Sequence, residues 1–222
     1  MIRVFEPKLT FKDKLSVLKT MQKNNISGTS PTVDLFEKKL AEKFNRQYSV
    51  AVSNGSVALD VAFQLYDFKE GDEVIIPSFT IISCLSSILR TKATPVFCDV
   101  DEVTWNMTLE EVKRVTTKQT KAILLVHLYG LVGEVEEISQ FCNENNIVII
   151  EDAAESHGQM IGDKKCGSIG DISTFSFYAN KHITTGEGGA VLTDDYDKYL
   201  KIKQMINLDF VGEKRFIHDN LY

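Results

Sequence analysis

Short apolar runs that alternate with helical stretches constrain this chain more than any other feature. Runs rich in Val and Ile recur between residues 48 and 154, and each is followed by a stretch with helical spacing of its apolar residues. The predicted strands are 48–53, 73–77, 94–100, 121–129 and 147–154, and the helices between them are 55–66, 81–90, 108–116 and 134–146. This alternation is typical of parallel βαβ units. It predicts an α/β fold with a mostly parallel central sheet between helices.

The pattern changes on either side of this region. After residue 155, two predicted strands at 171–177 and 188–194 are separated by a compact loop without a helix, so we expect neighbouring strands with a functional connection. A last helix is predicted at 195–206. Before the alternation begins, residues 9–25 have helical spacing, and Pro31 suits the first turn of a helix over 31–44.

Composition excludes several classes of protein. The 222 residues are 43% hydrophobic and 25% charged with a net charge of −6, and this acidic balance argues against nucleic-acid binding. The four cysteines lie in or beside apolar segments without a CxxC pair, which predicts buried free thiols and no metal site. Reduced thiols without a signal peptide predict a cytoplasmic protein. The longest apolar stretch, 122–132, is too short to span a bilayer.

Ligands of open parallel sheets bind at the carboxyl ends of the strands, so the residues just after each strand are the candidates for a site. In SNGSVALD (53–60), Gly55 and Ser56 open a helix whose free N–H groups can bind an anion. The same residues could equally form an ordinary helix cap. In IIEDAAESHG (149–158), Asp152 ends a buried strand, where a carboxylate needs a cation or hydrogen-bond donors. It could instead cap the following turn, and His157 could be a supporting or a purely structural residue.

Two further places carry candidate residues. Ser176 and Lys181 lie near the end of the 171–177 strand, before the glycine-rich TTGEGG turn. Lys181 is either an amine placed to react or a solvent-facing loop lysine. His182, Thr184 and Thr185 are site groups or turn formers. In PSFTIIS (77–83), three residues could cover a planar ligand or simply pack in the core: Phe79, Thr80 and Ile81.

Together these places provide an anion cradle, a carboxylate, a lysine and a flat apolar surface at one sheet edge. Pyridoxal 5′-phosphate (PLP) needs this combination, because its phosphate suits a helix N-terminus, its ring nitrogen an acidic residue and its aldehyde a lysine. The dinucleotide motif GxGxxG and the Walker motif GxxxxGK[ST] are both missing from the sequence.

The motifs also resemble those of a known family. The segments VSNGSVAL, DEVIIPSFT, ATPVFCDVD, LVHLYG, IIEDAAESHG and GDISTFSFYANKHITTGEGGAVLTDD resemble, in this order, the DegT/DnrJ/EryC1/StrS aminotransferases. The resemblance extends from about residue 27 to the end of the chain. It implies the type I aspartate-aminotransferase fold and PLP-dependent transfer of an amino group from L-glutamate to a nucleotide-linked keto sugar. The form of the 175–189 element is most similar to that of members acting on 4-keto-6-deoxy sugars, as in perosamine or viosamine synthesis.

The resemblance assigns roles to individual residues. Lys181 matches the lysine that forms the Schiff base, and Asp152 matches the partner of the pyridine nitrogen. The remaining cofactor contacts that it implies are Gly55, Ser56, the backbone of Val57, Ile81, Glu155 and Ser176. Ile81 stands where several members have an aromatic residue over the ring, so it would stack less well. Phe79 and His182 are candidate substrate contacts.

The resemblance also bears on domains, partners and rival functions. It implies an N-terminal helical segment (1–30), a PLP-binding large domain (31–210) and the start of a connection to a small domain (211–222). The chain therefore looks like a large domain without its small domain, and we expect a homodimer with the active site at the interface, without nucleic acid or membrane partners. Rival hypotheses are a non-catalytic or split-gene fragment of the PLP fold, a sugar dehydratase of the same family, and a nucleotide-binding α/β module without PLP. Dehydratases of the family have His in place of the lysine, so Lys181 favours transamination.

Overall fold

The computed structural model describes residues 6–208 of the chain, and within them it has an α/β fold. Its helices are α1 (Phe11–Gln22), α2 (Pro31–Lys43), α3 (Gly55–Gln64), α4 (Ile82–Leu89), α5 (Leu109–Val115), α6 (Val135–Glu144) and α7 (Tyr196–Met205), with a short 3₁₀ turn η1 (Leu128–Gly130). Its strands are β1 (Tyr48–Val52), β2 (Glu73–Pro77), β3 (Thr94–Cys98), β4 (Thr120–Val126), β5 (Val148–Asp152), β6 (Met160–Ile161), β7 (Lys164–Lys165), β8 (Ile172–Ser176) and β9 (Gly189–Thr193).

The central sheet has seven strands in the order β1-β9-β8-β5-β4-β2-β3. Strands β8, β5, β4, β2 and β3 are parallel, and β9 runs antiparallel to both of its neighbours, β8 and β1. Because two antiparallel steps restore the direction, β1 also runs parallel to β8. The predicted α/β class with a mostly parallel sheet is therefore confirmed, as is the pairing of the two strands that flank the lysine loop.

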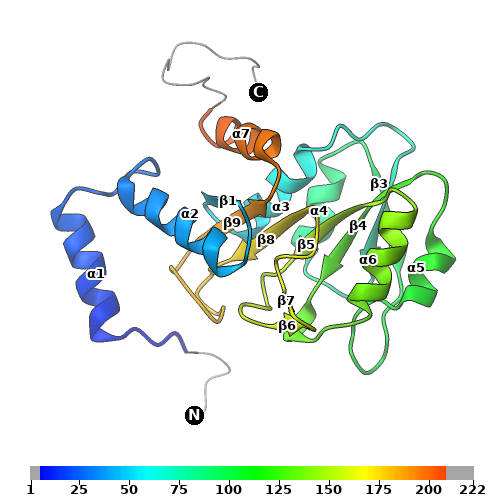
Figure 1. Cartoon of the computed structure of the whole chain (residues 1–222), viewed down its shortest axis with the longest axis horizontal. Coiled ribbons are helices and arrows are strands. Elements are labelled where there is room, and N and C mark those ends of the chain that lie inside the picture. Colours follow the sequence, from blue (N-terminus) through cyan, green and yellow to red (C-terminus); the bar gives the residue numbers. More distant parts are fainter. Residues whose placement is uncertain (1–5, 209–222) are drawn as a thin grey trace.

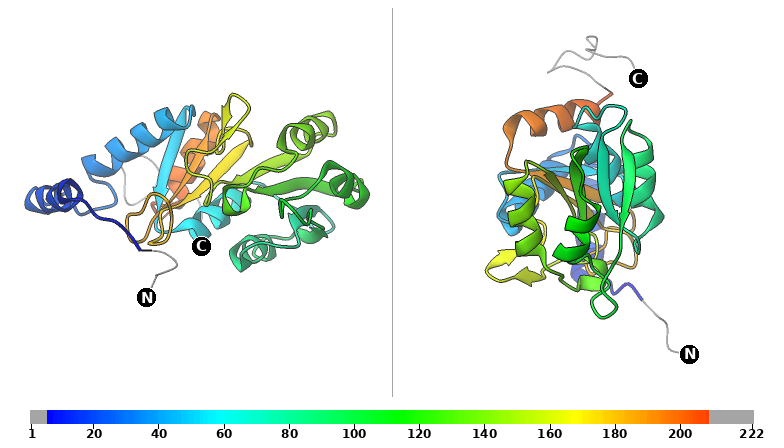
Figure 2. Two further views of the ribbon diagram at one scale, coloured as in Figure 1. Left: turned by 90° about the horizontal axis from the view of Figure 1, so that it is seen from below. Right: turned by 90° about the vertical axis from the view of Figure 1, so that its right-hand side faces the viewer.

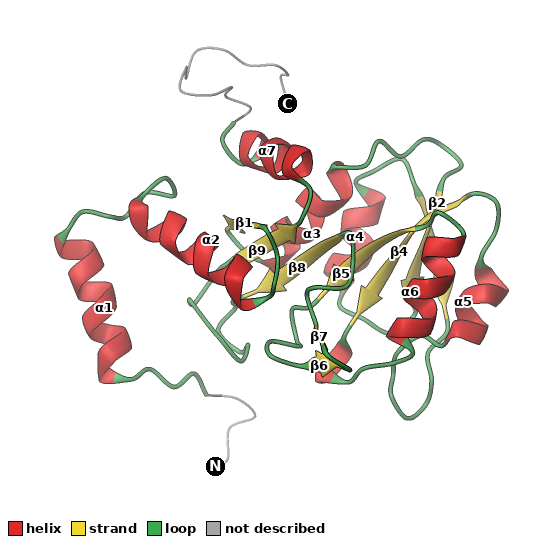
Figure 3. Ribbon diagram, viewed as in Figure 1, coloured by secondary structure: helices red, strands yellow, loops and turns green. Residues whose placement is uncertain are grey.

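Helices cover both faces of this sheet (Figures 1 and 3). Apolar side chains of α3, α4 and α7 pack on one face, where Phe63 and Ile88 are fully buried. Helices α5 and α6 pack on the other face, and the C-terminal half of α2 joins them there through Leu40 and Phe44. Figure 2 shows these layers edge-on. Because helices cover both faces, the edges of the sheet are the places where it can bind a ligand.

Element boundaries agree closely with those expected from the sequence. Strand β4 ends at Val126 instead of residue 129, because residues 128–130 form the η1 turn, in which Tyr129 has a φ of 54°. The small β6–β7 hairpin was not predicted; its two-residue strands are too short to give a periodic pattern. All four cysteines are buried with free thiols, as predicted.

Helix α1 differs from the others because it lies apart from the sheet (Figures 1 and 2). It is the helix of the expected N-terminal segment, and a capping box between Thr10 and Asp13 starts it. It buries none of its own residues in the described part of the chain. The predicted connection at 211–222 lies outside the described residues. Among residues 6–208, no helix combines the length and the apolar character that crossing a membrane requires.

Candidate active site

The carboxyl ends of β1, β2, β4, β5 and β8 meet at one edge of the sheet. The candidate residues named above lie at or shortly after these ends: Gly55 to Val57 after β1, Phe79 and Ile81 after β2, Asp152 and Glu155 at and after the end of β5, and Ser176 and Lys181 at and after the end of β8. This edge is where an open α/β sheet places its ligands.

The N-terminus of α3 forms the first part of the site. Asn54 caps the helix, and its Oδ1 accepts a hydrogen bond from the Val57 N–H at 2.9 Å. The Val57 N–H therefore already has an intramolecular acceptor, whereas an anion at this helix end can use the other free N–H groups of the first turn. The Ser56 hydroxyl lies 2.7 Å from the hydroxyl of Ser83 on α4, a neighbour that sequence reasoning did not identify.

Gly55 brings this helix end against β8. A Cβ atom at residue 55 would lie 2.8 Å from the Cβ and 3.2 Å from the Oγ of Ser176. Glycine therefore allows the Ser176 hydroxyl to approach the helix N-terminus. The two residues, which are far apart in the sequence, form one cradle of hydroxyl and N–H donors.

Asp152 forms the second part of the site. Its carboxylate is 4% exposed; Oδ1 accepts the Ala154 N–H at 3.0 Å and lies 3.5 Å from the Thr174 hydroxyl, while Oδ2 lies 3.5 Å from the Cys84 thiol. Burial raises the pKa of Asp152, and the Ala154 N–H, the Cys84 thiol and the charge of Lys181 oppose this rise. A buried carboxylate with so weak a donor at Oδ2 would gain from a cationic N–H partner.

Lys181 forms the third part of the site. Its Nζ lies 2.9 Å from Oε1 of Glu155, and its side chain is 14% exposed, so it is not the solvated loop lysine of the alternative interpretation. The other oxygen of Glu155 accepts the Tyr129 N–H at 2.9 Å. Burial raises the pKa of Glu155, but the hydrogen bonds from Lys181 and Tyr129 outweigh it and lower the pKa overall. Glu155 therefore remains a carboxylate that orients the amine.

The remaining predicted residues lie around this centre. Phe79 is 48% exposed and meets Trp105 edge to face, and Ile81, just before α4, is 61% exposed. Neither packs in the core, which was the alternative for both. His182 lies beside His157, with 6.1 Å between the ring centroids. Burial and the nearby charges of His182 and Lys181 lower the pKa of His157 to about 4, so it is neutral.

A second buried acid, Glu151, directly precedes Asp152 on β5. The sequence analysis assigned it no role. Its carboxylate is fully buried on the face of β5 opposite to that of Asp152. Its hydrogen-bond donors are the N–H groups of Gly167, Ile169 and Gly170, the Ser173 hydroxyl and the His127 ring. An acid inside the apolar run IVIIED is the sequence signal that could have identified it, because a buried charge requires partners.

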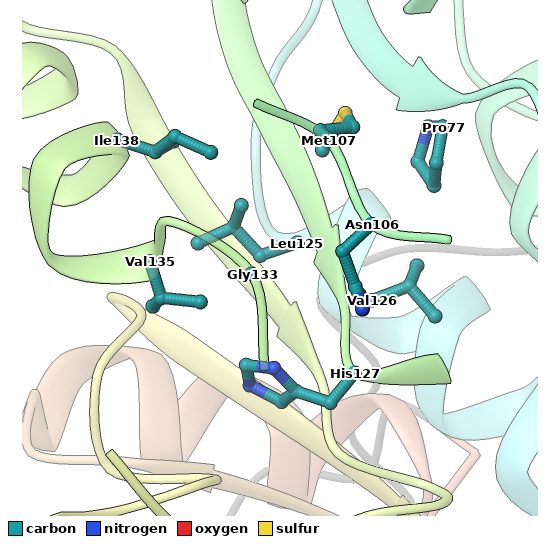
Figure 4. A pocket seen from close by; sticks show the side chains of 9 residues that line it. All are labelled: Pro77, Asn106, Met107, Leu125, Val126, His127, Gly133, Val135 and Ile138. Carbon is teal, nitrogen blue, oxygen red and sulfur yellow. The ribbon is translucent and has the colours of Figure 1, made fainter. Parts of the chain in front are cut away.

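His127 also lines a small cavity between β4 and the start of α6 (Figure 4). Its walls are mostly apolar, and Leu125, Val135 and Ile138 line it together with the imidazole. The cavity volume is about 10 Å³, which is close to the space of one water molecule. The cavity therefore cannot hold a substrate, and the described partner of the His127 ring is Glu151.

The three parts of the site fit a phosphorylated aromatic aldehyde. The Gly55–Ser56–Ser176 cradle suits the phosphate, the donor-poor Oδ2 of Asp152 suits a ring N–H, and the oriented amine of Lys181 suits the aldehyde. Within residues 6–208 no group of three His, Cys, Asp or Glu side chains is arranged to hold a metal ion.

Comparison with known proteins identifies a family of aminotransferases. The model of the DegT/DnrJ/EryC1/StrS aminotransferase family matches residues 8–221. A GDP-perosamine synthase of Escherichia coli O157:H7 is 44% identical over 205 residues, which are 91% of this chain and 56% of that protein. The crystal structure of an aminotransferase from Psychrobacter cryohalolentis superposes with a TM-score of 0.88 at 35% identity, covering 98% of this chain and 58% of that one. A GDP-4-keto-6-deoxymannose-3-dehydratase with a trapped PLP–glutamate adduct superposes with a TM-score of 0.86 at 27% identity, covering 91% and 54%. The chain thus spans little more than half the length of these relatives.

Proposed function

Because the chain belongs to the DegT/DnrJ/EryC1/StrS aminotransferase family, we propose that it is the PLP-binding part of a nucleotide-sugar aminotransferase. Its reaction would transfer the amino group of L-glutamate to a nucleotide-linked 4-keto-6-deoxyhexose in deoxyamino-sugar biosynthesis. The observation that carries this proposal is the shielded Lys181 amine, held by Glu155 beside the buried Asp152. The 44% identity to a GDP-perosamine synthase supports a GDP-linked sugar as the first substrate to test.

The cofactor supplies an electron sink that makes a carbon next to nitrogen acidic, and the chain supplies the groups around it. Lys181 Nζ would hold the cofactor through its aldehyde carbon, and as a free amine it would take a proton from the donor's Cα and return one. Glu155 orients this amine through its 2.9 Å hydrogen bond. Asp152 would hold the proton on the ring nitrogen. Gly55, Ser56 and Ser176 would fix the phosphate end together with the free N–H groups of the first turn of α3, whereas the Val57 N–H is held by Asn54.

The exposed apolar side chains around the site support a homodimer with the site at its interface. Phe79, Ile81, Ile82, Trp105 and Tyr129 are between 43% and 70% exposed, and all follow strand ends at the site edge. An apolar surface of this kind around a reactive centre favours burial against another protein surface. Residues 31–210 would form the PLP-binding unit of each protomer.

The decisive experiment traps the cofactor on the lysine. The purified protein is mixed with PLP, reduced with borohydride, digested and mapped by mass spectrometry. We expect the reduced pyridoxyl group on Lys181 in the wild type and no such group in Lys181→Ala. The control variant is Lys203→Ala, because Lys203 forms an ion pair with Glu37 and is not one of the candidate site residues. Cofactor fixed to a different lysine would contradict the role of Lys181, and no fixed cofactor at all would favour a nucleotide-binding module without PLP.

Turnover tests the remaining roles. In the full-length protein, Asp152→Asn should bind some PLP but lose orders of magnitude in rate, and near-normal turnover would remove Asp152 from its role. GDP-, UDP- and dTDP-linked 4-keto-6-deoxy sugars are then compared with L-glutamate as donor. Release of an amino sugar identifies an aminotransferase, release of a deoxygenated keto sugar identifies a dehydratase, and bound PLP without turnover identifies a non-catalytic protein.

A further inference from the structure

Asp152 has a neighbour that the proposed chemistry does not use. Cys84, in the first turn of α4, is fully buried, and its Sγ lies 3.5 Å from Oδ2 of Asp152. The hydroxyl of Thr80 lies 3.3 Å from the same sulfur. Thr80, Cys84 and Asp152 therefore form a continuous chain of hydrogen-bonding groups that runs from the exposed edge of the site to the buried carboxylate.

We propose that Cys84 is a positioning residue, whose thiol donates to Oδ2 of Asp152, orients the carboxylate and favours its ionised form. The inference rests on the proposed role of Asp152 at the cofactor's ring nitrogen. Cys84 and Asp152 belong to different strand–helix units, because α4 follows β2, whereas Asp152 ends β5.

The direction of the hydrogen bond follows from the surroundings of the sulfur. Burial raises the pKa of the Cys84 thiol far above its ordinary value, and the charge of Asp152 raises it further. The group is therefore S–H and carries one proton to donate. Since a carboxylate accepts only, that proton points to Asp152, and the sulfur lone pairs are left to accept from the Thr80 hydroxyl.

The two oxygens of Asp152 are held in different ways. Oδ1 accepts the Ala154 N–H at 3.0 Å, which is a firm backbone hydrogen bond. For Oδ2, the thiol is the hydrogen-bond donor among residues 6–208. A thiol is a weak donor that uses one lone pair of Oδ2, so it can help to fix the rotation of the carboxylate while Oδ2 remains able to accept a stronger N–H. A carboxylate facing a ring nitrogen requires this combination.

The packing keeps the thiol in place. Cys84 belongs to the apolar core on the α3 and α4 face of the sheet, where Ile88 and Ile150 are also fully buried. Its sulfur therefore cannot turn to solvent, and its distance from Asp152 is set by the packing of α4 on the sheet. Replacing Cys84 changes two things, the packing and the hydrogen bond, which the test has to separate.

The test measures the pKa of Asp152 in the protein without added cofactor, from the ¹³C shift of its carboxyl carbon, assigned by its loss in Asp152→Asn. We expect Cys84→Ala to raise this pKa by about one unit, which is about tenfold in the ionisation constant. Cys84→Ser should restore most of the wild-type value, because a hydroxyl also donates. Cys142→Ala is the matched control, since Cys142 is a fully buried thiol in the opposite core cluster.

Thr80→Val provides a second variant that opens no core cavity, because Thr80 is only partly buried. It should raise the pKa of Asp152 in the same direction and by less. An unchanged Asp152 pKa in both Cys84→Ala and Thr80→Val, or an equal rise in Cys142→Ala, would overturn the proposal. Borohydride mapping of Lys181 in the same variants tests the proposed function separately, because a lysine adduct does not depend on the thiol.

Discussion

Glu151 provides the strongest quantitative prediction of this structure. It is fully buried, and five donors converge on its carboxylate: three backbone N–H groups, a hydroxyl and an imidazole. Burial alone would raise its pKa, but the hydrogen bonds from His127, Gly170 and Gly167 outweigh it and lower the pKa from 4.5 to about 2. In Glu151→Gln an amide replaces one acceptor oxygen, so an N–H group faces backbone N–H donors that cannot accept a hydrogen bond from it.

The cost of this change follows from the pKa. A lowering of this size corresponds to about 3 kcal/mol of folding free energy, at 1.36 kcal/mol per unit. Breaking a buried charged pair by removing one partner costs about 3–5 kcal/mol, which agrees. For a chain of this length each kcal/mol lowers the Tm by about 2–4 °C, so Glu151→Gln should lower it by about 6–12 °C at pH 7. Because the folded pKa is lowered, this stabilisation is complete above the ordinary carboxyl pKa and is lost as the pH falls towards 2.

Urea denaturation and thermal unfolding at several pH values measure this effect. Glu144→Gln is the control, because Glu144 is an exposed glutamate near the end of α6. The stability difference between wild type and Glu151→Gln should be large at pH 7 and shrink as the pH falls below 4.5. A loss below about 1 kcal/mol at pH 7, the value of an ordinary hydrogen bond, would refute the assigned role of Glu151.

Two other changes test the site itself. Gly55→Ala places a Cβ 2.8 Å from the Cβ of Ser176, which should push the Ser176 hydroxyl away from the helix N-terminus; an overpacking cost of about 1–3 kcal/mol corresponds to PLP binding weakened by about 5-fold to 100-fold. Gly28→Ala, where a Cβ meets nothing within 4 Å, is its control, and equal affinities by fluorescence titration would contradict the cradle. Since the pKa of Glu155 is lowered by Lys181, wild type should lose stability as the pH falls below about 4.3, and Glu155→Gln should lose less. Identical Tm-against-pH curves for the two proteins would show that the Lys181–Glu155 pair does not contribute to stability.

Much of this molecule could be predicted from local sequence. The strand and helix ranges followed from apolar periodicity and from turn residues, which act over a few neighbouring positions. The edge of the sheet that bears the candidate site followed from the rule for parallel strands, and Asp152, Ser176 and Lys181 do lie there. Their assignment to cofactor atoms is a prediction that the experiments above test.

The order of strands and helices and the reactive groups at the strand ends depend on residues close together in the chain, so both can be predicted from local sequence. Which of these groups meet depends on the packing of the whole fold. It placed the Cys84 thiol beside Asp152, the helix end at Gly55 against Ser176, and His127 against Glu151. These contacts join positions 24 to 121 residues apart, and they form only when strands and helices pack side by side. A buried charge needs hydrogen-bond donors, and these donors come from distant parts of the chain that meet in the core. The local sequence pattern does not show which residues meet there.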